Sequence, residues 1–512
     1  MDQIQPALSP VIRLNPADNV LVARTSLETG TVVAPGVAAI QPIPRGHKVA
    51  AEAIARGEAV RKYGQIIGYA RTDIAAGQHV HVDEVAMSDL ELDYQFCVDA
   101  RPLPAVPEAE RASFLGYRRA DGRVGTRNYI AIVSSVNCSA TVCRAVADHF
   151  NKGGGLDGTR HIDGVVALTH GGGCALNTEE EGYRFLTRTL AGYATHPNVG
   201  GAVFIGLGCE TNQIAALMQR HGLVEGQTLR AMNMQDVGGT RATIEAAIAA
   251  VRAMLPAVDA VERTRAPLSG LVVALECGGS DGYSGISANP ALGHAADLIV
   301  RHGGTAVLSE TPEIYGAEHL LTRRAVTPEV GRKLIERIAW WRDYAERGRA
   351  ELNNNPSHGN KAGGLTTILE KSLGAVAKSG SAPLSAVYEF AEPVTERGFV
   401  FMDTPGYDPV AVTGQIAGGC NLVAFTTGRG SASGFKPSPT IKIATNTPMF
   451  TKLEEDMDID CGTVVTGEET VEQAGARIFE LILAVASGRH SKSEAQDYGH
   501  NEFVPWQVGA VM

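Results

Sequence analysis

The chain has 512 residues, of which 44% are hydrophobic, 20% are charged and 58 are glycine. This composition is typical of a globular protein with many tight turns, and it excludes disordered, collagen-like and coiled-coil chains. The formal net charge is −11 and no basic run interleaved with aromatic residues occurs, which argues against nucleic acid as a partner. Neither an apolar leader nor a stretch of about 18 apolar residues is present. We therefore expect a cytoplasmic protein that does not bind membranes.

The length predicts about three domains. In residues 1–92, short apolar runs alternate with turn residues, which predicts a small β-rich domain. Within it, the amphipathic residues 47–57 are expected to form a helix that stops at Gly57. Residues 93–113 contain three prolines and several charges, so we expect a linker there.

From residue 114 onward the pattern changes to β-branched runs that end in glycine-rich loops and lead into helical stretches. Such alternation predicts an α/β fold with mostly parallel sheets. Apolar residues recur at helical spacing in residues 243–255, 329–348 and 469–488. A charged segment before Pro267 predicts two lobes, and the expected catalytic lobes are 114–266 and 267–512.

Four of the eight cysteines end four of these β-branched runs. Cys138, Cys174, Cys209 and Cys277 follow one another at 36, 35 and 68 residues, close to one or two steps of a βα unit of about 34 residues. Parallel strands would place the four thiols along one carboxyl edge, where α/β sheets bind their ligands. Thiolates bind zinc, iron and iron–sulfur clusters. The alternative is that each cysteine packs as a small buried hydrophobic residue.

Two further metal-ligand types accompany these cysteines. His170 precedes Cys174 by four residues, and Glu210 directly follows Cys209. Imidazole and carboxylate would complete an iron or manganese site. A packing histidine and an acidic residue at a helix start are the alternatives.

The loop of residues 276–290 has four glycines with polar residues between them. Backbone amides in such a loop can approach an anion closely, while Asp281 supplies an acid. Two more loops offer cations, Lys361 and Arg429, and an arginine fork binds carboxylates bidentately. The candidate substrate-binding residues are Gly279, Ser280, Asn289, Asn360 and Arg429.

The β-rich domain contributes three histidines. His79 and His81 are two residues apart and share one face of a strand. We expect this pair to be exposed strand histidines. His47 lies in a separate segment of the same domain.

Taken together, these motifs resemble the altronate and galactarate dehydratase family over nearly the whole chain. Residues 18–23, 43–50, 63–70 and 79–85 are similar to its SAF domain, in the same order. The remaining motifs that carry the resemblance are GYRRADGRVGTRN, HGGGC, GLGCETNQ, ECGGSDGYSGISANP, NPSHGNKAGG, EKSLGAVAKSG and FTTGRG. The positions matching family motifs are His47, Cys138, His170, Cys174, Cys209, Glu210, Cys277, Asp281, Asn360, Lys361 and Arg429.

The resemblance implies a lyase that removes water from a sugar acid and leaves a 2-keto-3-deoxy acid. It implies Fe²⁺ as cofactor, with Mn²⁺ as a second choice, and an iron–sulfur cluster on the cysteines is the alternative. His170 is the first choice for one proton-transfer role, or a metal ligand instead, and Asp281 or Lys361 takes the other role. His47 is expected to reach the catalytic site, and Arg429 or Lys361 to neutralise substrate charge.

D-altronate is the expected substrate, because residues 313–321 and 361–374 resemble altronate dehydratases more closely. Galactarate is the second choice and sulfolactate, in a sulfo-lyase reaction, the third. A non-catalytic sugar-acid binding protein is the alternative from another class. Two departures from the family motifs, at His358 and within residues 170–174, leave the exact sugar acid open. A symmetric homo-oligomer is the general expectation.

Overall fold

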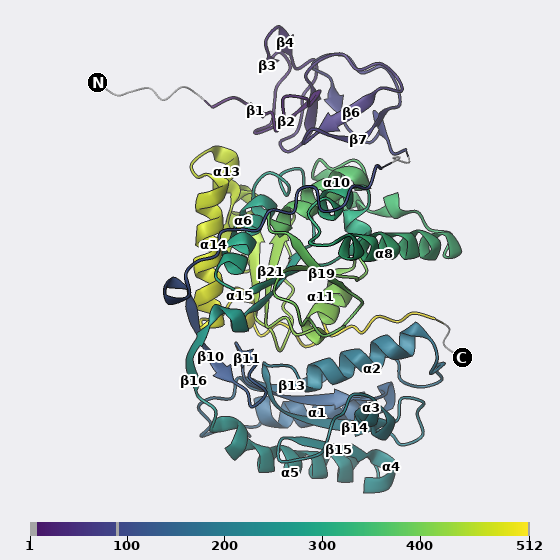
Figure 1. Ribbon diagram of the computed structural model, residues 1–512, viewed down its shortest axis with the longest axis vertical. Helices are drawn as coiled ribbons and strands as arrows, with labels where there is room; N and C mark the ends of the chain where they lie inside the picture. Colours follow the sequence, from purple (N-terminus) through teal and green to yellow (C-terminus); the bar gives the residue numbers. More distant parts are fainter. Residues whose placement is uncertain (1–7, 89–91, 510–512) are drawn as a thin grey trace.

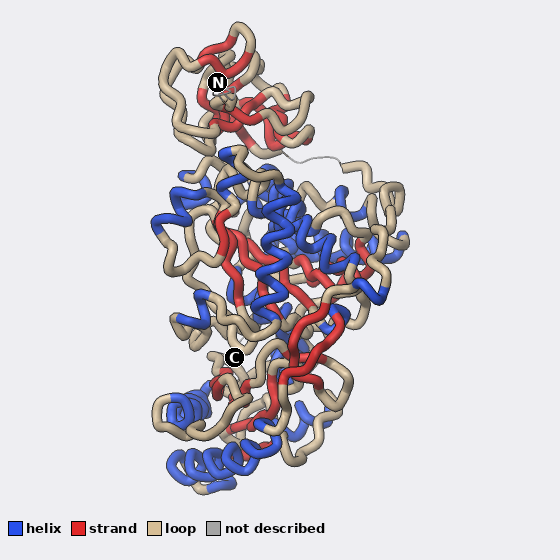
Figure 2. Tube along the Cα trace, turned by 90° about the vertical axis from the view of Figure 1, so that its left-hand side faces the viewer, coloured by secondary structure: helices blue, strands red, loops and turns tan. Residues whose placement is uncertain are grey.

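The computed structural model describes residues 8–88 and 92–509. Three parts follow one another along the long axis of the molecule: a small β domain, a large α/β body and a second α/β domain (Figures 1 and 2). The outer ends of the β domain expected over 1–92, namely 1–7 and 89–91, lie outside the described residues, as do 510–512. No helix in the described ranges is both long and apolar enough to cross a bilayer.

The N-terminal β domain is built from short antiparallel strands. They form a sheet of order β1-β2-β5-β8, a sheet of order β6-β7-β9 and the hairpin β3-β4. The strands are β1 (Val11–Ile12), β2 (Val20–Ala23), β3 (Val32–Ala34), β4 (Val37–Ala38), β5 (Lys48–Ala50), β6 (Ala59–Lys62), β7 (Gln65–Ala70), β8 (His79–Val80) and β9 (Val85–Ala86).

The helix expected over residues 47–57 is wrong. Lys48–Ala50 is strand β5, which pairs with β2 on one side and β8 on the other. All three of its residues are buried, so the segment has no solvent-facing side of the kind an amphipathic helix needs. Gly46 and Gly57 have φ values of +78° and +84° and form turns on either side.

The segment expected to be a linker runs along the body. The backbone amides of Cys97 and Asp99 donate to the carbonyl oxygens of Thr322 and Arg323, at 3.2 and 2.7 Å. The chain then enters an antiparallel ribbon of order β11-β10-β16, which joins the body to the second α/β domain. The ribbon strands are β10 (Ser113–Arg118), β11 (Val124–Gly125) and β16 (Arg263–Pro267).

The second α/β domain has a parallel sheet of order β13-β12-β14-β15. Alternate residues of β12 face opposite layers: Ile130 and Ile132 pack with α1 and α5, whereas Ala131 and Val133 pack with α2 and α3. The helix predicted over 243–255 is confirmed as part of α5. The elements are β12 (Tyr129–Ser134), α1 (Ala140–Asn151), β13 (Gly164–Leu168), α2 (Glu181–Ala194), β14 (Val199–Gly206), α3 (Ile214–Arg220), β15 (Leu229–Asn233), α4 (Met234–Val237) and α5 (Thr240–Asp259).

The body is built on a parallel sheet of order β19-β20-β18-β17-β21-β22-β23. Helices α6 and α14 cover one face, and α11 together with α2 of the second domain covers the other. The strands are β17 (Val272–Cys277), β18 (Thr305–Leu308), β19 (Leu384–Tyr388), β20 (Gly398–Met402), β21 (Leu422–Thr427), β22 (Thr440–Ala444) and β23 (Ile459–Asp460). The helices are α6 (Ala288–Arg301), α7 (His319–Thr322), α8 (Pro328–Arg347), α9 (His358–Ala362), α10 (Ile368–Val376), α11 (Asp408–Ala417), α12 (Thr447–Lys452), α13 (Gly462–Thr466), α14 (Val471–Ala486) and α15 (Lys492–Ala495).

This topology confirms the helices predicted over 329–348 and 469–488, which are α8 and α14. It also shows that the single edge of four cysteines is wrong. Cys138, Cys174 and Cys209 follow strands of the four-stranded sheet, whereas Cys277 ends β17 in the other sheet. The spacing of 68 residues between Cys209 and Cys277 suggests two further βα units of one sheet. It does not show that the chain leaves the four-stranded sheet and passes through the ribbon strand β16 before the body sheet begins.

Strand order in the body reverses around β17. The chain first adds β18 on one side of β17, and later places β21 on the other side. In open α/β sheets the crevice at such a reversal, beyond the carboxyl ends of the strands, is where ligands bind. The loops after β17 and β21 are therefore the expected walls of a site.

The C-terminal tail ties the two α/β parts together. It runs between α11 and α2 (Figure 1) and places Trp506 in an aromatic cluster. The Trp506 ring stacks on Trp341 of α8 with centroids 5.2 Å apart, and on Phe185 of α2 at 5.1 Å. One hydrophobic core thus spans two domains.

We expect Trp506→Ala to lower the thermal midpoint of the full chain, because truncating a buried tryptophan costs about 3–5 kcal/mol. Trp506 is 7% exposed. Trp506→Phe keeps part of the stack and should recover much of the loss. Thermal unfolding followed by calorimetry measures both. A Trp506→Ala midpoint equal to that of the original chain would contradict a core shared through the tail.

Candidate active site

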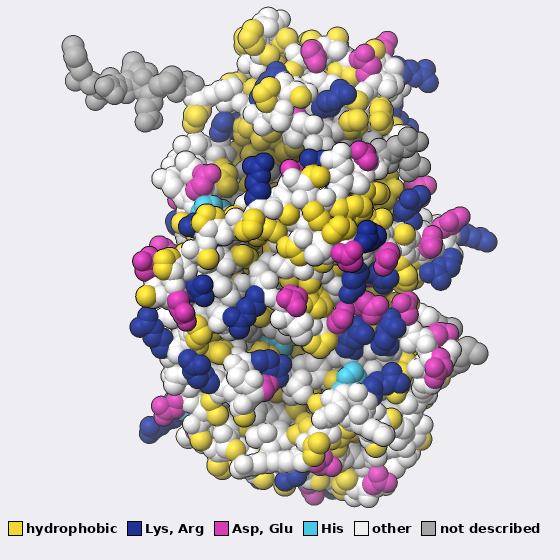
Figure 3. Space-filling model, viewed as in Figure 1, with side chains coloured by type: hydrophobic (Ala, Val, Ile, Leu, Met, Phe, Trp, Pro, Cys, Tyr) yellow, Lys and Arg dark blue, Asp and Glu magenta, His cyan; other side chains and the backbone are white. Residues whose placement is uncertain are grey.

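A cavity of about 570 Å³ opens where the N-terminal β domain meets the body. Asp281 reaches it from the loop after β17, Arg429 from the loop after β21, and His47 from the β domain. Figure 3 shows Lys and Arg side chains along this boundary on one face of the molecule. The cavity lies at the strand-order reversal of the body sheet, so the fold and the cavity indicate the same site.

Close backbone approaches hold the β domain against this loop. A Cβ atom on Gly282 would lie 2.0 Å from the carbonyl oxygen of Gly46, so no side chain fits there. The Gly282 amide donates to the Gly363 carbonyl oxygen at 2.8 Å. The Tyr283 hydroxyl donates to the Ala23 carbonyl oxygen at 3.0 Å. Glycines in three motifs are therefore needed because three turns pack together at the cavity wall.

The Asp281 carboxylate is held by its own loop and by the loop after β22. Oδ1 accepts hydrogen bonds from the Tyr283 amide and the Ser284 hydroxyl, both at 3.1 Å. The Thr445 hydroxyl donates at 3.0 Å to Oδ1, and the Asn446 amide donates at 3.1 Å to Oδ2. Burial raises the pKa of Asp281 above its usual range although these hydrogen bonds oppose the shift. The result is a fixed carboxyl group with enhanced affinity for a proton.

Three cations line the same cavity. Arg45 comes from the β domain, Arg429 from the loop after β21, and Lys452 from α12. The Gly279 carbonyl oxygen accepts the amides of Gly428 and Arg429 at 3.1 and 2.8 Å, which fixes the loop that carries the Arg429 guanidinium. In a chain with a net charge of −11, this concentration of positive charge favours an anionic ligand.

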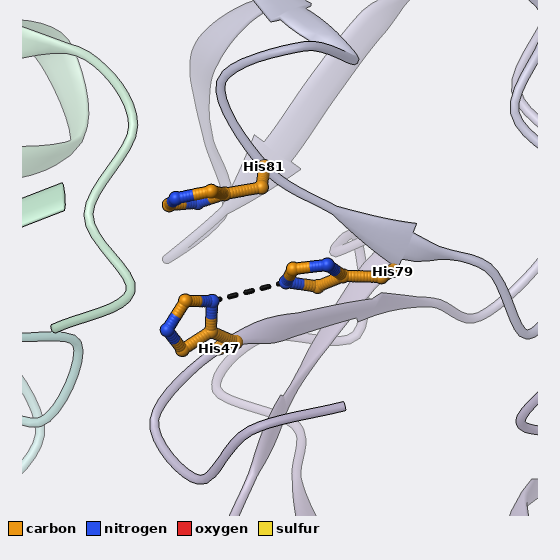
Figure 4. Close-up of side chains that lie close together, drawn as sticks. All are labelled: His47, His79 and His81. Atoms are coloured by element: carbon orange, nitrogen blue, oxygen red, sulfur yellow. Dashed lines mark hydrogen bonds between the residues drawn. The ribbon is translucent and has the colours of Figure 1, made fainter. Parts of the chain in front are cut away.

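His47, His79 and His81 form a cluster beside the cavity (Figure 4). His47 Nδ1 lies 3.0 Å from His79 Nε2, and one ring nitrogen from each histidine lies within 4.8 Å of the others. Burial lowers the pKa of His47 and His81 to about 4 and also lowers that of His79, so all three are neutral near pH 7. His81 Nδ1 is buried and has no hydrogen-bond partner among the described residues. Neutral imidazoles with a free nitrogen are suitable ligands for a divalent cation.

Sequence reasoning missed this cluster, because His79 and His81 were expected to be exposed and are in fact partly buried. Val49 of β5 pairs with His79 of β8, which brings the preceding turn, and His47 in it, against the pair. The signal lies in a strand pairing across some thirty residues. In the sequence, the segment of His47 and the segment of His79 and His81 have only the presence of histidine in common.

His170 and Glu210 lie in the second α/β domain, at the carboxyl edge of its sheet. His170 Nε2 donates to the Ser134 carbonyl oxygen at 3.0 Å, while Nδ1 accepts from the Gly172 amide at 3.2 Å. Burial lowers its pKa to about 4. The Glu210 carboxylate accepts from the Ser135 hydroxyl at 2.6 Å and from a backbone amide. The structure does not bring these two side chains to the cavity of Asp281.

Cys277 is buried inside the body. Its Sγ lies 3.6 Å from Glu310 Oε2 and 3.7 Å from Glu313 Oε2. Lys371 forms an ion pair with Glu313 at 2.6 Å. Lys378 forms one with Glu310 at 2.9 Å. Burial raises the thiol pKa well above its usual value, as do the two acids. The group is a compact charge network beneath the carboxyl end of β17, separate from the other cysteines.

The remaining candidates divide between wall and scaffold. The Asn360 amide donates to the Ser280 carbonyl oxygen at 2.8 Å and braces the loop that carries Asp281. Asn289 is buried, and its amide donates to the Gly374 carbonyl oxygen at 2.8 Å. Lys361 lines a neighbouring cavity of about 850 Å³ rather than the cavity of Asp281.

Comparison with known proteins gives a consistent assignment over the whole chain. Three family models match in order: the altronate/galactarate dehydratase SAF domain at residues 9–88, the D-galactarate dehydratase/altronate hydrolase second domain at 116–259, and the D-galactarate/altronate dehydratase C-terminal domain at 268–511. Galactarate dehydratase (L-threo-forming) of Escherichia coli is 38% identical over 98% of this chain and 97% of its own. Altronate dehydratases of Escherichia coli and Bacillus subtilis are 37% and 34% identical, each over 95% of this chain and 97% of theirs. With a cationic cavity, a fixed carboxyl group and relatives matched end to end, the chain belongs to the altronate/galactarate dehydratase family of hydro-lyases.

Proposed function

We propose that this chain is a metal-dependent hydro-lyase that dehydrates a six-carbon sugar acid, with D-altronate as the first substrate and galactarate as the second. The observation that carries the proposal is the cavity at the strand-order reversal, where the Asp281 carboxyl group faces three cations. Its volume of about 570 Å³ lies within the range typical of small-molecule sites.

The cations bind the acid end of the substrate. Arg429 presents a planar fork that matches a carboxylate, and Arg45 and Lys452 add positive charge from two other elements. Together they fix the substrate and neutralise the negative charge that grows on its carboxylate when C2 loses a proton. Three cations also suit an acid with a carboxylate at each end, and this observation keeps galactarate as the second candidate.

Asp281 is the residue that we assign to proton transfer at C2. Its raised pKa makes the ionised carboxylate a stronger base than an exposed aspartate. The Asp281 carboxylate takes the C2 proton, the electron pair of the C2–H bond forms the C2–C3 double bond, and the C3 hydroxyl leaves as water with the proton that Asp281 has taken up. The resulting enol takes up a proton at C3 and loses the proton of its C2 hydroxyl, which gives the 2-keto-3-deoxy acid.

His47, His79 and His81 are the residues that would hold Fe²⁺ or Mn²⁺. Their neutral imidazoles and the unpartnered His81 Nδ1 fit such an ion. A bound divalent cation supplies Lewis-acid stabilisation of negative charge on the substrate. The Ala362 carbonyl oxygen, 3.3 Å from His47 Nε2, orients the His47 ring.

We expect His79→Ala and His81→Ala each to weaken binding of Mn²⁺ by more than about tenfold, since loss even of a group that orients a ligand costs that much. The exposed His490 serves as the matched control, and His490→Ala should leave affinity unchanged. Calorimetric titration of the full chain with Mn²⁺ measures the affinity. Unchanged affinity in both cluster variants would rule out the three-histidine site.

The substrate is tested by anaerobic assay of the full chain with Fe²⁺ or Mn²⁺. Release of keto acid from D-altronate with a higher kcat/KM than from galactarate supports the first substrate, and the reverse order selects the second. Release of sulfite from sulfolactate would replace both with a sulfo-lyase. Binding of these acids without turnover under any metal would contradict catalysis.

A further inference from the structure

One side of helix α12 forms a wall of the Asp281 cavity. The residues of this segment that line the cavity are Asn446, Pro448, Met449, Lys452 and Leu453. Residues three and four positions apart share one side of a helix, so these five form a single stripe along the helix axis. The six residues of α12 rise by about 1.5 Å each. The helix therefore runs for about 9 Å beside the cavity.

The first end of this stripe lies at the Asp281 carboxyl group. The Asn446 side-chain amide donates to Asp281 Oδ2 and to the Gly428 carbonyl oxygen, both at 3.1 Å. Asn446 Oδ1 accepts from the Met449 amide at 3.0 Å, which caps the start of the helix. Arg429 directly follows Gly428. One asparagine thus ties the start of α12 to Asp281 and to the loop that carries Arg429.

The other end of the stripe carries Lys452, which lies in the last turn of α12. The loop of Arg429 packs against this end as well, since a Cβ on Gly430 would clash with the Leu453 side chain. Helix and loop are therefore fixed against each other at both ends. The distance along the cavity from the Asp281 carboxyl group to Lys452 is set by the length of the helix.

The cavity wall holds more positive charge than one carboxylate neutralises. Its cations are Arg45, Arg429 and Lys452. Among the described residues that line the cavity, Asp281 is the only acid. Glu454 comes two residues after Lys452 but does not line the cavity, and its carbonyl oxygen accepts from Lys492 Nζ at 2.7 Å where the chain turns toward α15. An anionic group of the ligand is thus the natural partner of Lys452.

We propose that Lys452 binds the C6 end of the substrate and is the residue through which the cavity accepts a sugar acid with a carboxylate at each end. Proton transfer at C2 keeps C1 and C2 beside Asp281 and Arg429. Five C–C bonds of about 1.5 Å separate C1 from C6, so an extended six-carbon acid is shorter than about 8 Å. It fits along α12 and ends at Lys452. The Lys452 ammonium group pairs with a C6 carboxylate, whereas it makes only a weaker hydrogen bond to a C6 hydroxyl, which carries no charge.

This inference rests on the proposed function, since it places a six-carbon acid with C2 at Asp281. It predicts which acid depends more on Lys452, and it does not rank the two acids in the original chain. Lys452→Gln in the full chain with Mn²⁺ should lower kcat/KM for galactarate by at least about tenfold, mainly through KM. The same variant should lower kcat/KM for D-altronate by less than about threefold. Lys452→Arg should keep the galactarate value, because it keeps the charge.

A pair of unreactive acids tests the subsite without turnover. Adipate and 6-hydroxyhexanoate have six carbons and differ only in having a carboxylate or a hydroxyl at C6. Calorimetric titration of the Mn²⁺-loaded chain should show that Lys452→Gln weakens adipate binding by at least about tenfold and 6-hydroxyhexanoate binding by less than about threefold. If the original chain dehydrates neither sugar acid, the proposed function fails, while this pair still decides the role of Lys452.

Lys152→Gln is the matched control. Lys152 is an exposed lysine of the second α/β domain, outside the cavity, and its loss changes the net charge by the same amount. It should leave the affinity for both unreactive acids unchanged. Equal losses for both acids in Lys452→Gln, no binding of adipate by the original chain, or a loss specific to the dicarboxylate in Arg45→Gln but not in Lys452→Gln would each overturn the proposal.

Discussion

Asp281→Asn should lower kcat for sugar-acid dehydration by about 10²–10⁴-fold, the range that a positioned proton-transfer group contributes. Asparagine keeps the shape of the side chain and can still accept the Tyr283 amide and the Ser284 hydroxyl. It removes the basic oxygen. KM should change little, because the cations rather than Asp281 bind the substrate carboxylate. Steady-state assays of keto-acid formation, with the pH profile of kcat, measure the effect.

Asp403 offers a control for loss of a buried acid as such. It is 3% exposed, its pKa is raised to about 6 mainly by burial, and it accepts from the Trp341 indole at 2.7 Å, away from the cavity. Asp403→Asn should affect thermal stability more than kcat. If Asp281→Asn keeps kcat within a few-fold of the original chain, Asp281 is part of the scaffold and not the base.

The second large effect concerns the attachment of the β domain to the body. Glu370 of α10 accepts ion pairs from Lys48 and Lys62 of the β domain, both at 2.9 Å, and all three side chains are buried. Glu370→Ala leaves two ammonium groups in the interface without a partner. Removal of one member of a buried ionic group costs about 3–5 kcal/mol. We expect the β domain to detach, with His47 leaving the cavity.

Limited proteolysis within residues 93–113 and hydrogen exchange of the β domain measure the detachment. Addition of Lys62→Met to Glu370→Ala removes one of the stranded charges and should restore part of the attachment in a double-mutant cycle. Proteolysis of Glu370→Ala at the original rate would contradict the role of the ion group.

The pKa of Glu370 determines how the stability of the same contact changes as the pH falls. Lys48 and Lys62 hold the pKa of Glu370 far below its ordinary value, although burial alone would raise it. A carboxyl group with a lowered folded pKa contributes stability above its unfolded pKa, about 4.3, and loses it only as the pH falls toward the folded pKa. The attachment of the β domain should therefore persist in mildly acidic buffer.

Regular elements were predictable where the periodicity was long. The amphipathic patterns of α5, α8 and α14 extend over sixteen to twenty residues, so local sequence determines them. Residues 47–57 mislead because a short apolar pattern fits a helix as well as two strand pairings. The cysteine spacing misleads for a different reason. The number of residues between two cysteines indicates how many βα units separate them, but not whether those units belong to the same sheet.

The residue types of the site could be predicted from the sequence, but only some of their positions relative to one another could. Asp281 and Arg429 sit at the ends of predicted parallel strands, and the rule for such sheets places them together. His47 enters the cavity through the docking of a separate domain, which no local pattern encodes. Lys361 is in a motif loop with Asn360, yet α9 turns the two side chains toward different surroundings.

The core shared through Trp506 has a consequence for synthesis on the ribosome. Phe185 and the rest of α2 are complete long before the tail that packs on them has been made. Until then the outer face of α2 has no cover, since α11 and the tail both come from later parts of the chain. The second domain is therefore left with an apolar surface until α11 and the segment around Trp506 have been made, and these later residues are the ones that cover it. A chain truncated before Trp506 would therefore have a folded second domain with an exposed apolar surface, a state that chaperones recognise.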